Sequence, residues 1–193
     1  GMRILISPAK TMSAGPSAAE MTMPQHLETT AQILAWLREQ MPDTLRKLWK
    51  CSDAILQENL LRIRRMRLAD GLTPAITCYE GSVYRHIAPQ TLTEESMAYL
   101  QDHLRILSAF YGVLRPLDGI TPYRMEMQTK ARVCGNADLY RFWGSRLYEA
   151  VRDDSGILIN LASKEYAKCV SDYLTGDDRM ITCTFGETAA DGY

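Results

Sequence analysis

The sequence lacks any long apolar run, and nothing in it approaches the roughly 18 apolar residues that a membrane-spanning helix requires. It also lacks an N-terminal basic segment followed by an apolar stretch and a small-residue cleavage site, so nothing marks the protein for export. Apolar residues make up 46% and charged residues 23%, which is typical of an ordinary globular domain. We therefore expect a cytoplasmic protein with no membrane partner.

Metal-binding and disulfide patterns are missing as well. The five cysteines are odd in number and contain no CxxC pair, and the three histidines have no partner at ligand spacing. We therefore expect buried free thiols, no metal and no cofactor. A cysteine that consumes peroxide would need an exposed thiolate beside a cation, and only Cys169, next to Lys168, suggests this.

The order of apolar segments predicts one domain of the α/β or closely mixed α+β class, because strands and helices alternate along the chain. A long amphipathic helix, or two helices in phase, is expected to begin at residue 43. A break near Cys51 would make two helices, and Ser52 could then cap the second. Strands are expected at residues 3–7, 75–79, 104–110, 156–161 and 179–185, and further helices at 24–41, 93–103, 136–152 and from Ser163 onward.

Positive charge is concentrated in one segment although the whole chain carries a net charge of −1. Residues 45–67 contain seven bases against Asp53 and Glu58, a net charge of +5. The bases at the end of this segment suit phosphate contacts, which dominate non-specific binding of nucleic acids. A solvated helix end remains the alternative, since Arg62 and Arg65 project from one flank of the helix and Arg64 from the other.

Ser7-Pro8-Ala9-Lys10 matches S-x-x-K, the nucleophile motif of some serine acyl-transfer enzymes. Pro8 pushes Ser7 towards an extended conformation and the supporting motifs are absent, so we interpret the match as chance. Lys10-Thr11 resembles the end of a phosphate-binding P-loop, but the required glycines are missing. One lysine and two hydroxyls nevertheless follow a strand at the end where α/β sheets bind ligands.

Three further features each allow two interpretations. Tyr111-Gly112-Val113 has the form of a helix-hairpin-helix turn, but glycine between apolar residues more often marks a tight bend. The loop that contains Arg115, Arg124 and Glu126 indicates either a ligand site or a structural ion-pair network. Asn160 and Ser163 lie between a strand and a helix N-terminus, where they could favour an anion or simply cap the helix.

Five segments in order along the chain resemble the YaaA family of bacterial peroxide-stress proteins. They are ILISPAKTM, YEGSVY, HLRILSAFYGVLRPLDGITPYRMEM, LYRFWG and INLASKEY. The matching positions are Ser7, Pro8, Lys10, Thr11, Gly81, Tyr84, Tyr111, Gly112, Arg115, Pro116, Asp118, Tyr123, Arg124, Glu126, Asn160, Ser163, Glu165 and Tyr166.

The resemblance implies a cytoplasmic bacterial protein that limits free iron and oxidative damage under hydrogen peroxide stress. It also implies a mixed sheet flanked by helices, unlike a doubly wound Rossmann fold, with a positively charged cleft, a helix-hairpin-helix-like element and DNA binding. Family members often have Lys-Gly-Asp where this chain has Glu80-Gly81-Ser82. They usually continue with a basic C-terminal segment, so residues 1–193 are expected to form a single domain without it.

Our leading hypothesis is a non-enzymatic protein that binds DNA without sequence specificity. Its expected contacts to DNA or another anion are Lys10, Thr11, Gly112, Arg115, Arg124, Asn160, Ser163, Arg62, Arg64 and Arg65. The alternative is an enzyme acting on a small anionic substrate in the same cleft, with Ser7, Lys10, Tyr123, Arg124 and Glu126 as candidate catalytic residues. Convergence of these side chains in a deep pocket would favour the enzyme, and a wide basic groove would favour nucleic acid.

Overall fold

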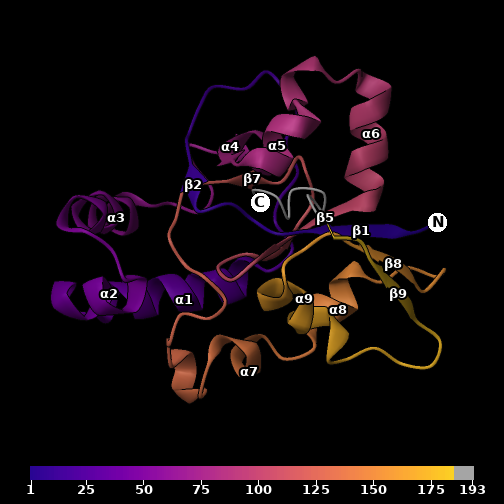
Figure 1. Ribbon diagram of the computed structural model, residues 1–193. Coiled ribbons are helices and arrows are strands. Elements are labelled where there is room, and N and C mark those ends of the chain that lie inside the picture. Colours follow the sequence, from indigo (N-terminus) through magenta and orange to yellow (C-terminus); the bar gives the residue numbers. More distant parts are fainter. Residues whose placement is uncertain (185–193) are drawn as a thin grey trace, which may run out of the picture.

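A five-stranded mixed sheet forms the centre of the computed structural model, which describes residues 1–184 (Figure 1). Its strand order is β6-β5-β1-β8-β9. The pairs β1·β5, β1·β8 and β8·β9 are parallel, whereas β5·β6 is antiparallel, so the predicted mixed sheet is confirmed and differs from a doubly wound one. The bounds are β1 Arg3–Ile6, β5 Leu104–Ser108, β6 Gly112–Leu114, β8 Ile157–Asn160 and β9 Arg179–Thr182.

Helices cover both faces of this sheet. Figure 1 shows α4 to α6 on one side of the strands and α7 to α9 on the other, with α1 to α3 at one end of the molecule. The bounds are α1 Leu27–Glu39, α2 Pro42–Trp49, α3 Asp53–Arg65, α4 Ala75–Cys78, α5 Ser82–Ile87, α6 Glu94–His103, α7 Leu139–Trp143, α8 Arg146–Val151 and α9 Lys164–Ser171. No helix within residues 1–184 is long and apolar enough to cross a membrane.

Short elements complete the fold. They are β2 Thr11–Met12 paired with β4 Tyr79–Glu80, β3 Thr73–Pro74 paired with β7 Gly119–Ile120, and 3-10 turns at Pro89–Thr91 and Val133–Gly135. Because β2 directly follows the loop after β1, this pairing holds the start of the chain against the loop that leads into α5.

The strand β1 lies in the middle of the sheet, between β5 and β8, two apolar segments that the sequence predicted as strands. Ile4 pairs with Leu104 on one side and with Ile159 on the other, and Leu5 is fully buried. Since β1, β5 and β8 are parallel, their carboxyl ends lie at the same edge. Ser7 follows β1 at this edge, where ligands of open α/β sheets commonly bind.

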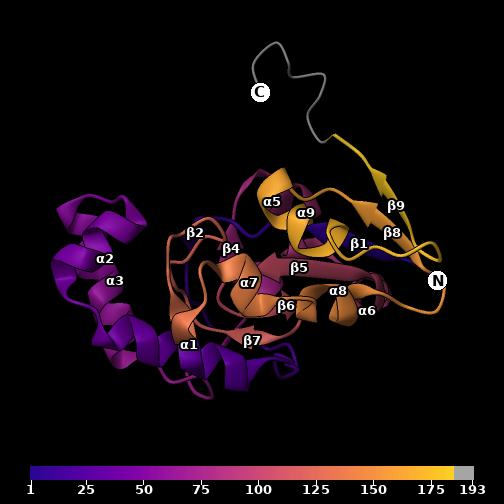
Figure 2. The same cartoon turned by 90° about the horizontal axis from the view of Figure 1, so that it is seen from below.

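The predicted break in the basic segment is confirmed. Lys50 ends α2 in the left-handed conformation with a φ of 50°, and the hydroxyl of Ser52 accepts a hydrogen bond of 3.3 Å from the backbone N–H of Ile55. Ser52 therefore caps α3, as expected for a hydroxyl residue at this position. The result is a pair of helices joined by a tight turn, which both views place at one end of the molecule (Figures 1 and 2).

Two predicted elements are wrong. Residues 75–79 form the single helical turn α4 and the start of β4, because a short apolar run can be buried as either a helix or a strand. The helix expected over residues 136–152 is divided into α7 and α8 by Gly144, whose φ is 57°, and Asp138 rather than Asn136 caps it. The last strand ends at Thr182 within the described residues, and residue 185 lies outside them.

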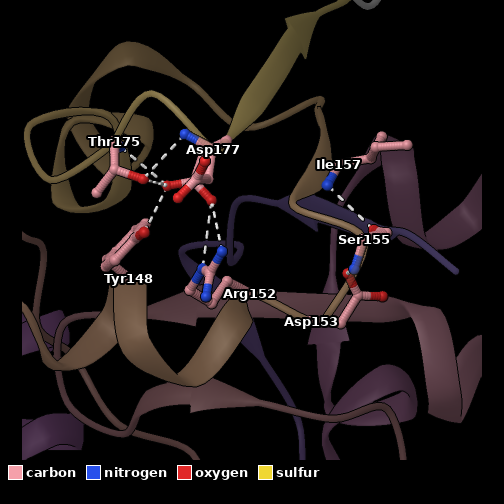
Figure 3. Close-up of polar contacts among 8 residues, drawn as sticks. Tyr148, Arg152, Asp153, Ser155, Ile157, Thr175 and Asp177 are labelled. Carbon is pink, nitrogen blue, oxygen red and sulfur yellow. Dashed lines mark hydrogen bonds and ion pairs between the residues drawn. The ribbon is translucent and has the colours of Figure 1, made fainter.

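A carboxylate fastens the turn between α9 and β9 to the body of the protein. Figure 3 shows the polar contacts in this region. Asp178 accepts hydrogen bonds from the Tyr148 hydroxyl and from the backbone N–H of Thr175, and it forms an ion pair of 3.1 Å with Arg152. The hydrogen bond from Tyr148, followed by the one from Thr175, lowers the pKa of Asp178 to about 2.

Candidate functional site

A pocket of about 210 Å³ lies at the carboxyl edge of the sheet, between the loop after β1, the loop after β7 and the start of α9. We call it the Lys10 pocket. It contains all five side chains that the sequence suggested as a catalytic set, although these come from segments more than 100 residues apart. Its lining residues are Ser7, Pro8, Ala9, Lys10, Tyr123, Arg124, Met125, Glu126, Ser163, Glu165 and Tyr166.

Lys10 has a carboxylate partner in this pocket. Its Nζ atom lies 3.2 Å from Oε1 of Glu126, and the two side chains are 76% and 38% exposed. An exposed pair of this kind contributes little to stability, because water solvates both charges. What the pair does provide is a hydrogen-bond donor, the Lys10 ammonium, beside an acceptor, the Glu126 carboxylate, at the mouth of the pocket.

The Ser7 side chain forms its hydrogen bonds with Ser163, whereas Lys10 pairs with a carboxylate. The Oγ of Ser7 accepts a 2.8 Å hydrogen bond from the backbone N–H of Ser163 and lies 3.3 Å from the Ser163 hydroxyl, while Lys10 pairs with Glu126. Ser163 is the N-cap residue of α9 but makes no side-chain capping bond to it, so capping by its hydroxyl is wrong.

The phenol of Tyr123 closes the inner end of the pocket and is fully hydrogen-bonded. It lies 2.7 Å from the Tyr79 hydroxyl and 2.7 Å from the Ser108 hydroxyl. Burial raises the pKa of Tyr123 and also that of Tyr166, which stay neutral as a result. Neither phenol is suited to act as a base near neutral pH, and both tyrosines form part of the pocket wall.

Arg124 connects the Lys10 pocket to the helix pair. Its Nη2 donates a 3.0 Å hydrogen bond to the carbonyl oxygen of Trp49, the last residue of α2. Thr121 and Pro122, which precede Tyr123 and Arg124 in the same loop, line a second hollow of about 340 Å³ together with Arg62 and Arg65. One loop therefore borders both the pocket and a basic groove, and Figure 1 shows it passing close to α2 and α3.

The exposed basic side chains of α2 and α3 divide into paired and unpaired groups. Arg46 pairs with Asp53 and Arg62 with Glu58. Among the residues that the structure describes, four exposed bases of this helix pair form no ion pair, and we call them the basic surface: Lys47, Lys50, Arg64 and Arg65. Arg62 and Arg65 face the groove and Arg64 is not among its lining residues, as the sequence indicated.

Several predicted site residues lie outside the Lys10 pocket. Arg115 pairs at 2.9 Å with the fully buried Asp118, so this part of the loop is a structural ion-pair network. Asn160 is buried, and its side-chain oxygen accepts a hydrogen bond from the backbone N–H of Ala162. Thr11 is exposed in β2 and is not a lining residue. The prediction that Lys10, Arg115 and Arg124 line one cleft is therefore wrong for Arg115.

Gly112 is a packing residue and not a phosphate contact. It begins the buried strand β6 with a φ of 82°, and a Cβ atom there would lie 2.8 Å from the Trp143 ring. A helix-hairpin-helix turn at residues 111–113 is therefore wrong.

Cys169 cannot serve as an exposed thiolate. It is 4% exposed, and burial raises its pKa to about 12. Residues 1–184 also contain no cluster of three or more histidine, cysteine, aspartate or glutamate side chains that could hold a metal ion.

Glu165 and Tyr166 both line the pocket, but the sequence singled them out only as positions that match the YaaA family and not as contact or catalytic residues. Glu165 lies in the first turn of α9, and its carboxylate accepts a 3.1 Å hydrogen bond from the backbone N–H of Gln128. Their only signal in the sequence is the segment INLASKEY, whose helix N-terminus follows a buried strand.

Comparison with known proteins identifies the family. The sequence pattern of the family described as "Peroxide stress protein YaaA" matches residues 2–193. A UPF0246 protein from Pediococcus pentosaceus is 47% identical over 187 residues, covering 96% of this chain and 74% of that protein. One from Lachnoclostridium phytofermentans is 45% identical over 187 residues, with coverages of 96% and 73%, and one from Agathobacter rectalis is 44% identical over 189 residues, with coverages of 97% and 76%. The chain therefore belongs to the YaaA family of peroxide stress proteins.

Proposed function

We propose that this protein acts in the response to hydrogen peroxide by binding DNA in the cytoplasm without sequence specificity, and that it limits the damage caused by free iron. The observation that carries the DNA-binding part is the basic surface of Lys47, Lys50, Arg64 and Arg65 on the α2–α3 pair. The family description supports the link to peroxide.

Unpaired bases on a projecting helix pair are suited to phosphate contacts. A lysine or arginine that already holds a carboxylate must lose that partner before it binds a phosphate, whereas an unpaired one exchanges only water and counterions. The release of counterions from DNA then drives non-specific binding and makes it dependent on salt. The short turn at Lys50 and the free cations on both sides of it support an approach of the DNA backbone to this end of the molecule.

A salt-titrated binding assay tests the proposal. Fluorescence anisotropy with a labelled duplex should give an affinity whose logarithm falls with log salt by about 0.9 per phosphate contact. Arg65→Ala and Lys50→Ala should each reduce that slope by roughly 0.9 if the residue neutralises one phosphate. Arg179→Ala is the matched control, because Arg179 is an exposed base at the start of β9, outside the helix pair, and should leave the slope unchanged.

Protection of DNA tests the second part of the proposal. Plasmid nicking by ferrous iron and hydrogen peroxide should decrease when the wild-type protein is added, and less so with Arg65→Ala. A duplex that does not bind at low salt, or an affinity that salt leaves unchanged, would exclude DNA binding through the basic surface. Equal protection by both proteins would show that the effect on iron does not depend on DNA binding through the basic surface.

A further inference from the structure

The Lys10 pocket is too balanced in charge to be a simple anion site. Lys10 and Arg124 contribute two positive charges, and Glu126 and Glu165 contribute two negative ones. A phosphate or carboxylate drawn to Lys10 would meet Glu126, whose oxygen already lies 3.2 Å from the ammonium. The expected small anionic substrate therefore fits this pocket poorly, and a neutral ligand with both donors and acceptors fits it better.

Its size points to a small ligand. The volume of about 210 Å³ lies below the roughly 300–1,000 Å³ of pockets that hold drug-sized molecules. Tyr123, Met125 and Tyr166 give it buried aromatic and apolar walls, while its polar groups lie on the loops around it. Apolar walls with a few converging donors and acceptors are typical of a site for one planar heterocycle.

The polar groups match the edge of a nucleobase. Each base displays donors and acceptors side by side, and carboxylates accept from exocyclic amino groups while lysine and arginine donate to ring nitrogens and carbonyl oxygens. Lys10 and Glu126 present this combination at the pocket mouth, and the hydroxyls of Ser7 and Ser163 add groups that can both donate and accept.

A nucleotide chain could reach the pocket from the basic surface. The groove lined by Arg65, Thr121 and Pro122 and the pocket lined by Tyr123 to Glu126 belong to the same loop, and Arg124 ties this loop to the end of α2. Phosphates held along the groove would therefore bring the neighbouring nucleotide close to the pocket. Enzymes and other proteins that read a base outside the duplex enclose it in a pocket of this type.

We propose that the Lys10 pocket binds a single nucleobase, with Glu126 and Lys10 reading its hydrogen-bonding edge between the walls of Tyr123 and Tyr166. The base comes either from a free nucleoside or from an unpaired nucleotide in DNA. The second source rests on the proposed DNA-binding function, whereas the first does not.

Titration with small molecules tests the pocket alone. The four deoxynucleosides, ribose 5-phosphate and inorganic phosphate are added to the protein, and binding is followed by NMR shifts of the tyrosine rings. At least one nucleoside should bind, and Glu126→Gln should weaken it roughly tenfold or more, because the carboxylate acceptor is replaced. Lys10→Met is a second variant at an exposed position, and Glu58→Gln on α3 is the matched control outside the pocket.

Binding of phosphate or ribose 5-phosphate as tightly as of the nucleoside would overturn the proposal, because the pocket would then read an anion.

A second experiment with DNA compares a duplex that contains one unpaired nucleotide with the same duplex containing an abasic site. Preference for the unpaired nucleotide, lost in Glu126→Gln, identifies DNA as the source, and nucleoside binding without that preference identifies free nucleosides. If DNA binds with no such preference and no nucleoside binds, the base pocket is refuted while the proposed function stands. If nucleosides bind and DNA does not, the base pocket stands and the proposed DNA-binding function is refuted.

Discussion

Tyr123→Phe should destabilise the protein more than Tyr79→Phe, although each change removes one buried hydroxyl. The reason is the number of hydrogen bonds, because among the described residues the Tyr123 hydroxyl has two partners and the Tyr79 hydroxyl one. Ser108 Oγ accepts from the backbone N–H groups of Phe110 at 3.2 Å and Tyr111 at 2.9 Å, so its own proton is donated to Tyr123 at 2.7 Å. Tyr123 in turn donates to Tyr79 at 2.7 Å.

The two variants therefore leave different numbers of groups without a partner. Tyr123→Phe deprives Ser108 of its acceptor and Tyr79 of its donor, whereas Tyr79→Phe leaves only the Tyr123 proton unsatisfied. Each unsatisfied buried group costs about 1 to 3 kcal/mol. We expect a loss of about 2 to 6 kcal/mol for Tyr123→Phe and about 1 to 3 kcal/mol for Tyr79→Phe.

Equilibrium unfolding in urea, followed by circular dichroism, measures both losses from the shift in midpoint at constant m-value. The double variant completes a thermodynamic cycle, and its loss should be smaller than the sum of the two single losses because the variants share one bond. Equal losses, or a larger loss for Tyr79→Phe, would show that the Tyr123 hydroxyl does not bridge the hydroxyls of Ser108 and Tyr79.

Two further predictions concern a glycine and a carboxylate. Gly112→Ala should cost about 2 to 5 kcal/mol in urea unfolding, because a left-handed φ and a clash with Trp143 both oppose a side chain, whereas Gly135→Ala, with a φ of 78° and no atom within 4 Å, should cost only about 1 to 2 kcal/mol. Similar losses would contradict the close packing at Gly112. The pKa of Asp178 is lowered to about 2 from 3.8, so its contribution to stability is complete above about pH 4 and is lost as the pH falls towards 2. The stability difference between wild type and Asp178→Asn should shrink over that range, and a constant difference would refute the pKa assignment.

Local signals in the sequence predicted local structure well. The hydroxyl and carboxylate at Ser52 and Asp53 located the start of α3, and the mostly apolar run after His103 located β5. Ala75 to Cys78 was misassigned because burial on all sides removes the periodicity that distinguishes a helical turn from a strand.

The candidate site was predictable only in part. The sequence suggested Lys10 and Glu126 as members of one candidate catalytic set, but it did not predict their ion pair, because a pair formed by residues so far apart in the chain depends on the tertiary fold. Arg115 and Arg124 were grouped because they are close in the sequence, yet one binds a buried carboxylate and the other a helix-end carbonyl. Proximity along the chain does not indicate which way a loop side chain points.

The central position of β1 has a consequence for how the chain folds. Ile4 is synthesised well before both of its partners, Leu104 and Ile159, which follow about 100 and 155 residues later in the chain. The middle of the sheet therefore closes only after the entropy of two long loops has been lost, and contacts of this kind slow folding. During synthesis on the ribosome, the apolar β1 segment must wait unpaired until β5 and then β8 emerge, and it is exposed to misassociation before the native sheet forms.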